Sequence, residues 1–169
     1  MKQEIPLPQT KKQPDKKWYI GIDPGIANTG FACSGCKTTW TTKTHKSQEK
    51  AARMSLILGE LIGHSWQCTT AKFGELYYVI EDFFGSYGRD TVQLVGVLIT
   101  ECYPRPTKLV QPAAWVRELF GEKNKGKYKE CALRYSKKHG WKPDDQHQAD
   151  AACLIEWAKK YWHEDNKEK

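Results

Sequence analysis

The chain lacks any hydrophobic run long enough to cross a lipid bilayer, which takes about 20 apolar residues. It shows no signal peptide, and its first 17 residues contain no arginine, which argues against an organellar transit peptide. Internal repeats are absent as well. The absence of a membrane span and of a targeting segment predicts a cytoplasmic protein with no membrane partner.

The six cysteines are scattered along the chain, a pattern that favours reduced thiols over a disulfide framework. One pair, Cys33 and Cys36, has the spacing of half a zinc site. No second Cys-x2-Cys and no matching pair of histidines follows it, so a hairpin turn at Ser34-Gly35 is the favoured interpretation, with half a zinc site as the alternative.

Acidic residues are outnumbered by basic ones, 20 to 27, which gives a formal net charge of +7 and a pI near 9.0. The chain also has 7 Trp, 8 Tyr and 5 Phe. Basic and aromatic side chains together suit a polyanion, because phosphates pair with the charges and bases stack on the rings. A merely soluble basic protein is the alternative. The composition therefore favours a nucleic acid over a small-molecule substrate.

The chain has the length of one domain. Residues 1–17 are predicted to be a flexible basic arm, 18–162 the folded domain and 163–169 a charged tail. Hydrophobic periodicity and turn residues predict five strands, five helices and a basic loop. The strands are expected at 18–24, 28–33, 37–44, 76–80 and 108–110. The helices are expected at 47–66, 90–103, 113–120, 128–138 and 145–162, and the loop at 121–127. This order predicts an α/β fold with a mixed sheet flanked by helices.

Two predicted strands end on carboxylates, Asp23 and Glu81, and the last predicted helix carries His147 and Asp150 on one face. Facing carboxylates repel one another unless a cation lies between them, and hard oxygen ligands suit Mg²⁺ or Mn²⁺. Two such ions about 4 Å apart could support phosphodiester hydrolysis. The alternative is that each acid caps neighbouring amides separately.

Three blocks of sequence contain these residues: "GIDPG" at 21–25 followed by Thr29-Gly30, "VIEDFF" at 79–84 and "HQADAA" at 147–152. Together they resemble the RuvC family of Holliday junction resolvases, within the RNase H-like superfamily. The resemblance implies an RNase H-like fold in which a mixed five-stranded sheet is flanked by helices. It also implies a homodimeric, Mg²⁺-dependent nuclease that cuts four-way DNA junctions, in a bacterial cell or in a host cell if the source is viral.

By the same resemblance, Asp23, Glu81 and Asp150 would be catalytic metal ligands. His147 would take the fourth position, at which many relatives have an aspartate. Asp144 and Asp145 are the alternatives for that position, although an acid just before a helix more naturally caps it.

Further residues fall where the family contacts DNA. Phe84, or Phe83 beside it, would stack on a junction base, while the basic side chains would lie near the phosphates. The basic candidates are Arg117, Lys127, Lys123 and Lys125. Rival functions are an RNase H, a flap or branched-DNA nuclease, and a non-catalytic junction-binding module. An actin-like ATPase is disfavoured because it needs a second lobe.

Overall fold

The computed structural model describes residues 17–71, 75–82 and 88–162, so the predicted arm and tail lie outside it except for Lys17. The strands are β1 (Lys17–Asp23), β2 (Asn28–Cys33), β3 (Thr38–Lys43), β4 (Glu75–Glu81) and β5 (Thr107–Val110). The α-helices are α1 (Lys50–Ala71), α2 (Arg89–Cys102), α3 (Pro112–Phe120), α4 (Tyr128–Lys138) and α5 (Gln146–Tyr161). A short 3₁₀ helix, η1 (Glu122–Lys127), precedes α4.

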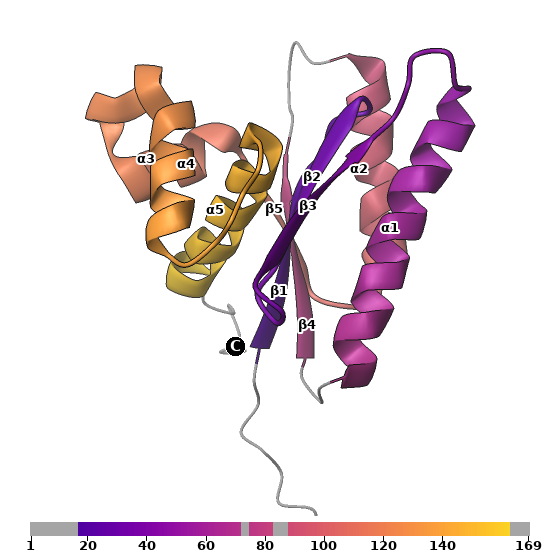
Figure 1. Cartoon of the computed structure of the whole chain (residues 1–169), viewed down its shortest axis with the longest axis horizontal. Coiled ribbons are helices and arrows are strands. Elements are labelled where there is room, and N and C mark those ends of the chain that lie inside the picture. Colours follow the sequence, from indigo (N-terminus) through magenta and orange to yellow (C-terminus); the bar gives the residue numbers. More distant parts are fainter. Residues whose placement is uncertain (1–16, 72–74, 83–87, 163–169) are drawn as a thin grey trace, which may run out of the picture.

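One five-stranded sheet in the order β3-β2-β1-β4-β5 forms the centre of the fold. The β1–β2 and β2–β3 pairs are antiparallel, whereas β1–β4 and β4–β5 are parallel. Figure 1 shows α1 and α2 on one face of this sheet and α3, α4 and α5 on the other. The fold is therefore α/β and RNase H-like, as the sequence predicts.

Both faces of the central strands are buried, and alternate side chains enter two separate cores. Ile20 and Ile22 of β1 pack with the α1 and α2 side, while Tyr19 packs with the α5 side. This explains why β1 and β4 are apolar between their first and last residues, as strands covered on both faces must be. No described helix is long and apolar enough to span a membrane.

Two predictions of local structure were wrong. The helix expected at 47–66 begins at Lys50 and continues to Ala71. Ser47 therefore precedes the helix, and its hydroxyl lies 2.7 Å from Nδ1 of His45. The basic loop expected at 121–127 is instead the 3₁₀ helix η1. Its N-cap is Gly121, which has a positive φ of 75°.

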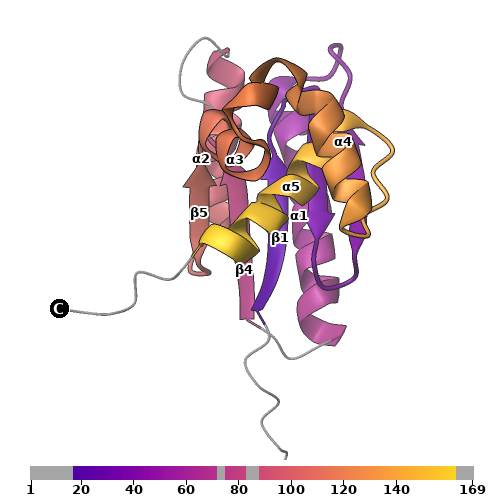
Figure 2. The same ribbon diagram turned by 90° about the vertical axis from the view of Figure 1, so that its left-hand side faces the viewer.

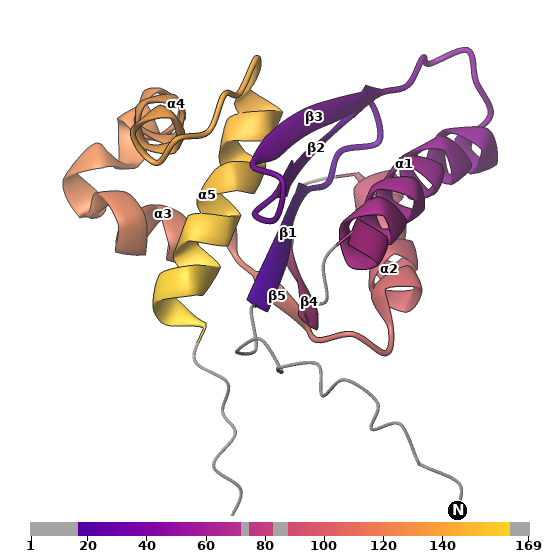
Figure 3. The same cartoon turned by 60° about the horizontal axis from the view of Figure 1, so that its bottom comes forward.

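Helix α5 lies directly against the backbone of β1 and β2, at two glycines. A Cβ atom on Gly21 would be 2.1 Å from the carbonyl oxygen of Ala151, and one on Gly30 would be 2.2 Å from that of His147. Real atoms do not approach so closely, so no larger residue fits without moving α5. Figure 3 shows α5 between the sheet and the α3 and α4 helices, where it is fixed on both sides.

We expect Gly30→Ala to lower the stability by about 1–3 kcal/mol or more, because the added methyl group meets backbone that cannot rotate away. Thermal unfolding measures this effect. Gly59→Ala is the matched control: Gly59 lies exposed on α1, and a methyl group there would have nothing within 4 Å. At this position alanine should stabilise the helix by up to about 1 kcal/mol. Equal unfolding temperatures for Gly30→Ala and the parent would contradict the packing argument.

Candidate active site

Asp23 and Glu81 are the last residues of the two parallel strands at the centre of the sheet. Ile22 of β1 is in register with Ile80 of β4, which places the two acids side by side at one edge. Both are buried. The chain leaves β1 through a tight turn, in which the Thr29 hydroxyl donates to the Gly25 carbonyl at 2.8 Å.

Helix α5 brings the other two predicted side chains to the same edge. Its N-cap is Asp145, which accepts a hydrogen bond from the Gln148 amide at 2.9 Å. Within the first turn, Nδ1 of His147 lies 2.7 Å from Oδ2 of Asp23. Asp150 is buried on the next turn. Figure 2 shows α5 crossing the sheet beside β1 and β4.

Antiparallel pairing explains why His147 reaches Asp23. Gly30 of β2 is the register partner of Asp23, and the His147 backbone rests on this glycine. The position without a side chain therefore lies beside the first acid of the site. Histidine meets aspartate because α5 can touch the strand there.

Two of the carboxyl groups, those of Glu81 and Asp150, are hard to ionise. Burial raises the pKa of Glu81 well above its usual range, and the charge of Asp23 and a hydrogen bond with it raise this pKa further. Burial, together with the charge of Asp23, raises the pKa of Asp150 to about 7. In the described part of the chain, no lysine or arginine forms an ion pair with any of these three acids.

Whereas the surroundings favour the neutral forms of Glu81 and Asp150, they favour the charged form of His147. Its hydrogen bond to Asp23 raises the pKa of the imidazole, and partial burial opposes that rise. The imidazole therefore compensates part of the charge of Asp23. The charges of His147 and Lys129 also lower the pKa of Asp150, but burial and Asp23 raise it by more.

This donor set fits a divalent cation. Asp23 is hydrogen-bonded to both His147 and Glu81, and its charge acts on Asp150; repulsion among the three carboxylates is what a bound cation would relieve. Asp144 and Asp145, the two alternatives to His147 for the fourth position, have other surroundings. Asp145 caps α5 and accepts the Thr41 hydroxyl at 2.7 Å, and Asp144 is exposed.

Two residues that support the acids were missed in the sequence. The indole Nε1 of Trp115 on α3 donates to Oε1 of Glu81 at 2.8 Å, and Nε2 of Gln146 donates to Oδ1 of Asp150 at 2.7 Å. Trp115 is fully buried, and a buried indole N–H needs an acceptor, but the sequence does not indicate which acid supplies it. Gln146 precedes Asp150 by four residues, a spacing that could have suggested the contact.

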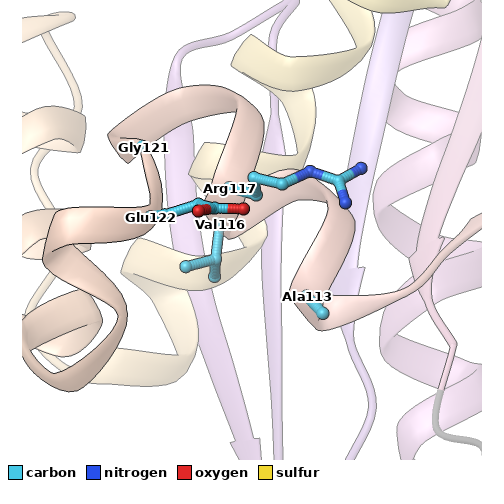
Figure 4. A pocket seen from close by; sticks show the side chains of 5 residues that line it. All are labelled: Ala113, Val116, Arg117, Gly121 and Glu122. Carbon is cyan, nitrogen blue, oxygen red and sulfur yellow. The ribbon is translucent and has the colours of Figure 1, made fainter.

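The predicted DNA contacts are only partly described. Arg117 on α3 is exposed, and its Nη2 lies 3.9 Å from Oε1 of Glu118. Lys127 is exposed where η1 ends. Arg117 also lines a pocket of about 420 Å³ with Ala113, Val116, Gly121 and Glu122 (Figure 4). The side chains of Lys123 and Lys125 lie outside the described part, as do Phe83 and Phe84.

The sheet order β3-β2-β1-β4-β5, with acids where the two central parallel strands end, is that of an RNase H-like fold. Within this class, the chain is similar to RuvC. The Thermus thermophilus RuvC structure has a TM-score of 0.62 and 20% identity, and the match covers 84% of this chain and 95% of that one. T. thermophilus RuvC in complex with Holliday junction substrate has a TM-score of 0.59 and 17% identity, covering 85% and 96%. No family model matches the chain, and no curated protein matches its sequence.

The raised acid pKa values predict how the metal-free protein responds to pH. A group whose pKa is higher in the folded state contributes stability at low pH, and this contribution is lost as pH rises through the folded pKa. With EDTA present, the unfolding temperature should therefore fall between about pH 4 and pH 7, the unfolded and folded pKa values of Asp150. Thermal scans across this range measure the slope.

Asp150→Asn should flatten that slope, because the amide does not titrate. Asp144→Asn makes the same chemical change at an exposed aspartate and should leave the slope unchanged. A slope equally steep in the Asp150→Asn protein would show that the acid is not strained in the fold.

Proposed function

We propose that this protein is a structure-selective endonuclease that resolves four-way DNA junctions by paired, metal-dependent nicks. The observation that carries the proposal is the convergence of Asp23, Glu81, Asp150 and His147 at one edge of a RuvC-like fold. A structure of T. thermophilus RuvC contains Holliday junction substrate, which supports this class of DNA as the substrate here.

In the proposed reaction, a water oxygen attacks phosphorus and the bond from phosphorus to the 3′ oxygen breaks, leaving a 5′-phosphate and a 3′-hydroxyl. Divalent cations, when bound, would favour ionisation of the water and stabilise charge on the departing oxygen. Asp23, Glu81 and Asp150 would hold them. Trp115 keeps the Glu81 carboxylate oriented through its N–H, and Gln146 does the same for Asp150.

His147 has two proposed contributions. Nδ1 holds a proton against Asp23 when no cation is bound, and the neutral ring offers a nitrogen ligand once that proton leaves. We propose Mg²⁺ as the ion, two per active site, with Mn²⁺ able to substitute, because the other ligands are carboxylate oxygens.

Six residues are proposed to contact the DNA. Arg117 and Lys127 would contact phosphates, together with Lys123 and Lys125 of η1. Phe84, or Phe83, would stack on a junction base, since both follow Glu81 closely in the sequence. Reduced thiols favour the cytoplasm, bacterial or of a viral host, as the compartment.

The proposed homodimer would form through the α1 and α2 face. Helix α2 buries Leu94 and Leu98 against the sheet but leaves a second apolar stripe exposed. In this stripe Val92 is 52% exposed and Tyr103, just after the helix, is 81% exposed. On α1, Trp66 is 68% exposed. A two-fold dimer would cover these side chains and give a junction two equivalent sites.

Cleavage of four substrates tests the function directly: an immobile four-way junction, a duplex, a flap and an RNA–DNA hybrid, each in Mg²⁺ and in EDTA. We expect the junction to be cut preferentially, and only in Mg²⁺. Preferential cutting of the hybrid or of the flap would favour another RNase H-like nuclease. Junction binding without cutting would favour a non-catalytic module.

Asp23→Asn should lower the rate of junction cleavage by about 100-fold or more yet leave binding intact. It removes a charged ligand and leaves the basic surface unchanged. Glu81→Gln and Asp150→Asn should act in the same way. Single-turnover cleavage and a gel-shift assay separate the two effects. Asp144→Asn is the control and should cut normally; undiminished cutting by Asp23→Asn would remove this residue from the mechanism.

Ile99→Glu should convert the proposed dimer into monomers, because a charge would be buried in the middle of the apolar stripe on α2. Sedimentation at micromolar concentration measures the change. Lys137→Glu on α4, on the other face of the sheet, should remain dimeric (Figure 1). A parent protein that sediments as a strict monomer would contradict paired incision.

Phe84→Ala should weaken cutting of fully paired junctions, because it removes a stacking surface worth roughly 1–3 kcal/mol per base. Junctions with unpaired bases at the crossover should be cut normally. Lys127→Ala, by contrast, should reduce the salt dependence of binding by about one phosphate contact on either substrate. Equal impairment of Phe84→Ala on both junctions would assign the stacking role to Phe83 or to neither residue.

A further inference from the structure

The β2–β3 turn and helix α1 bring together three side chains that can bind a metal. Cys33 is the last residue of β2, Cys36 lies in the turn and His64 lies on α1. Ligand atoms from all three, the two sulfurs and one ring nitrogen, lie within 4.8 Å of one another. We propose that these side chains bind one Zn²⁺ ion, which fastens the hairpin to α1.

The sulfur-to-nitrogen separation between Cys36 and His64 fits such an ion, and the third ligand atom lies within 4.8 Å of the other two. In a tetrahedral zinc site, Zn–S is about 2.3 Å and Zn–N about 2.0–2.1 Å, which separates sulfur from nitrogen by about 3.6 Å. Sγ of Cys36 already lies 3.4 Å from Nε2 of His64. Thiolate and imidazole ligands select zinc over Mg²⁺, which prefers oxygen.

The turn is held in place before any ion binds. Ser34 and Tyr19 exchange two hydrogen bonds: the Tyr19 amide donates to the Ser34 hydroxyl at 2.8 Å, and the Ser34 amide donates to the Tyr19 carbonyl at 2.9 Å. The His64 ring packs on Trp40, with ring centroids 3.9 Å apart. Both sides of the proposed site therefore have a fixed position.

The protonation state of the histidine also suits a ligand. Burial lowers the pKa of His64, so the imidazole is neutral at pH 7, as metal binding requires. The fourth position of a tetrahedral ion would be open to water or to another side chain. In the sequence, Cys68 follows His64 by four residues, a common zinc-ligand spacing, but its side chain lies outside the described residues and the proposal rests on the other three.

This site is separate from the acidic one. Cys33 lies three residues beyond Gly30 on β2, about 10 Å along the strand. Its side chain belongs to the core beneath α1, on the face of the sheet opposite α5. The two sites can therefore be distinguished by position and by ligand type.

Cobalt substitution of the full-length chain, purified with a reductant, tests the proposal. Thiolate bound to Co²⁺ gives a charge-transfer band that carboxylate ligands do not give, so the acidic site contributes nothing to it. We expect one equivalent of Co²⁺ to produce the band and one equivalent of Zn²⁺ to abolish it.

Cys36→Ser and His64→Gln should each weaken Zn²⁺ binding by at least roughly 10- to 100-fold, the loss that even outer-shell changes cause. Cys36 is exposed, so its serine variant should fold, and circular dichroism checks this. His45→Ala, which removes an exposed histidine of the same chain, should bind as the parent does. The absence of a thiolate band in the parent, an unchanged band in Cys36→Ser, or a Cys33–Cys36 disulfide under reducing conditions would overturn the proposal.

Discussion

Helix α5 touches the sheet backbone because two strand positions carry no side chain, and the geometry of the acidic edge depends on this contact. Gly21 and Gly30 leave room for the carbonyl oxygens of Ala151 and His147, where a methyl group would clash. With α5 seated this closely, His147 reaches Asp23, and Asp150 is buried near the strand ends. A helix held farther away by side chains would leave Asp23 and Glu81 as ordinary strand-end acids. The motif "GIDPG…TG" thus combines one acid with two glycines that let α5 bring His147 and Asp150 close to it.

The cost of this arrangement is electrostatic. Three carboxyl groups are buried together, and the pKa values of Glu81 and Asp150 are raised as a consequence. Apolar burial on both sides of the sheet offsets that cost, and the hydrogen bonds from Trp115 and Gln146 fix two of the acids in place. Strained groups held by a well-packed fold are typical of functional sites. Relief of this strain is the physical basis of the proposed cation site.

The two faces of the sheet differ in ways that bear on the proposals. The α5 side carries the acids and the exposed basic residues Arg117 and Lys127, and it suits DNA. The α1 and α2 side exposes apolar residues such as Tyr103 and Trp66, and it suits a second copy of the chain. The Cys33, Cys36 and His64 group also lies on this second side, where the hairpin meets α1. The proposed chemistry therefore lies on one side of the sheet, and the proposed dimer surface and hairpin site lie on the other.

The sequence alone determined the order of strands and helices, because apolar runs and turn residues are local signals. Asp23 and Glu81 could be predicted as neighbours, since each ends a buried strand, and His147 and Asp150 share a helix face by spacing. Only the tertiary structure decided which pairs touch. Trp115 donates to Glu81 across 34 positions, and His64 reaches Cys36 across 28, distances over which sequence periodicity carries no information. The sequence favours a simple turn at Cys33–Cys36 because the histidine beside this pair lies on another element. Contacts of this kind depend on how helices pack on the sheet, and packing is fixed by the whole chain.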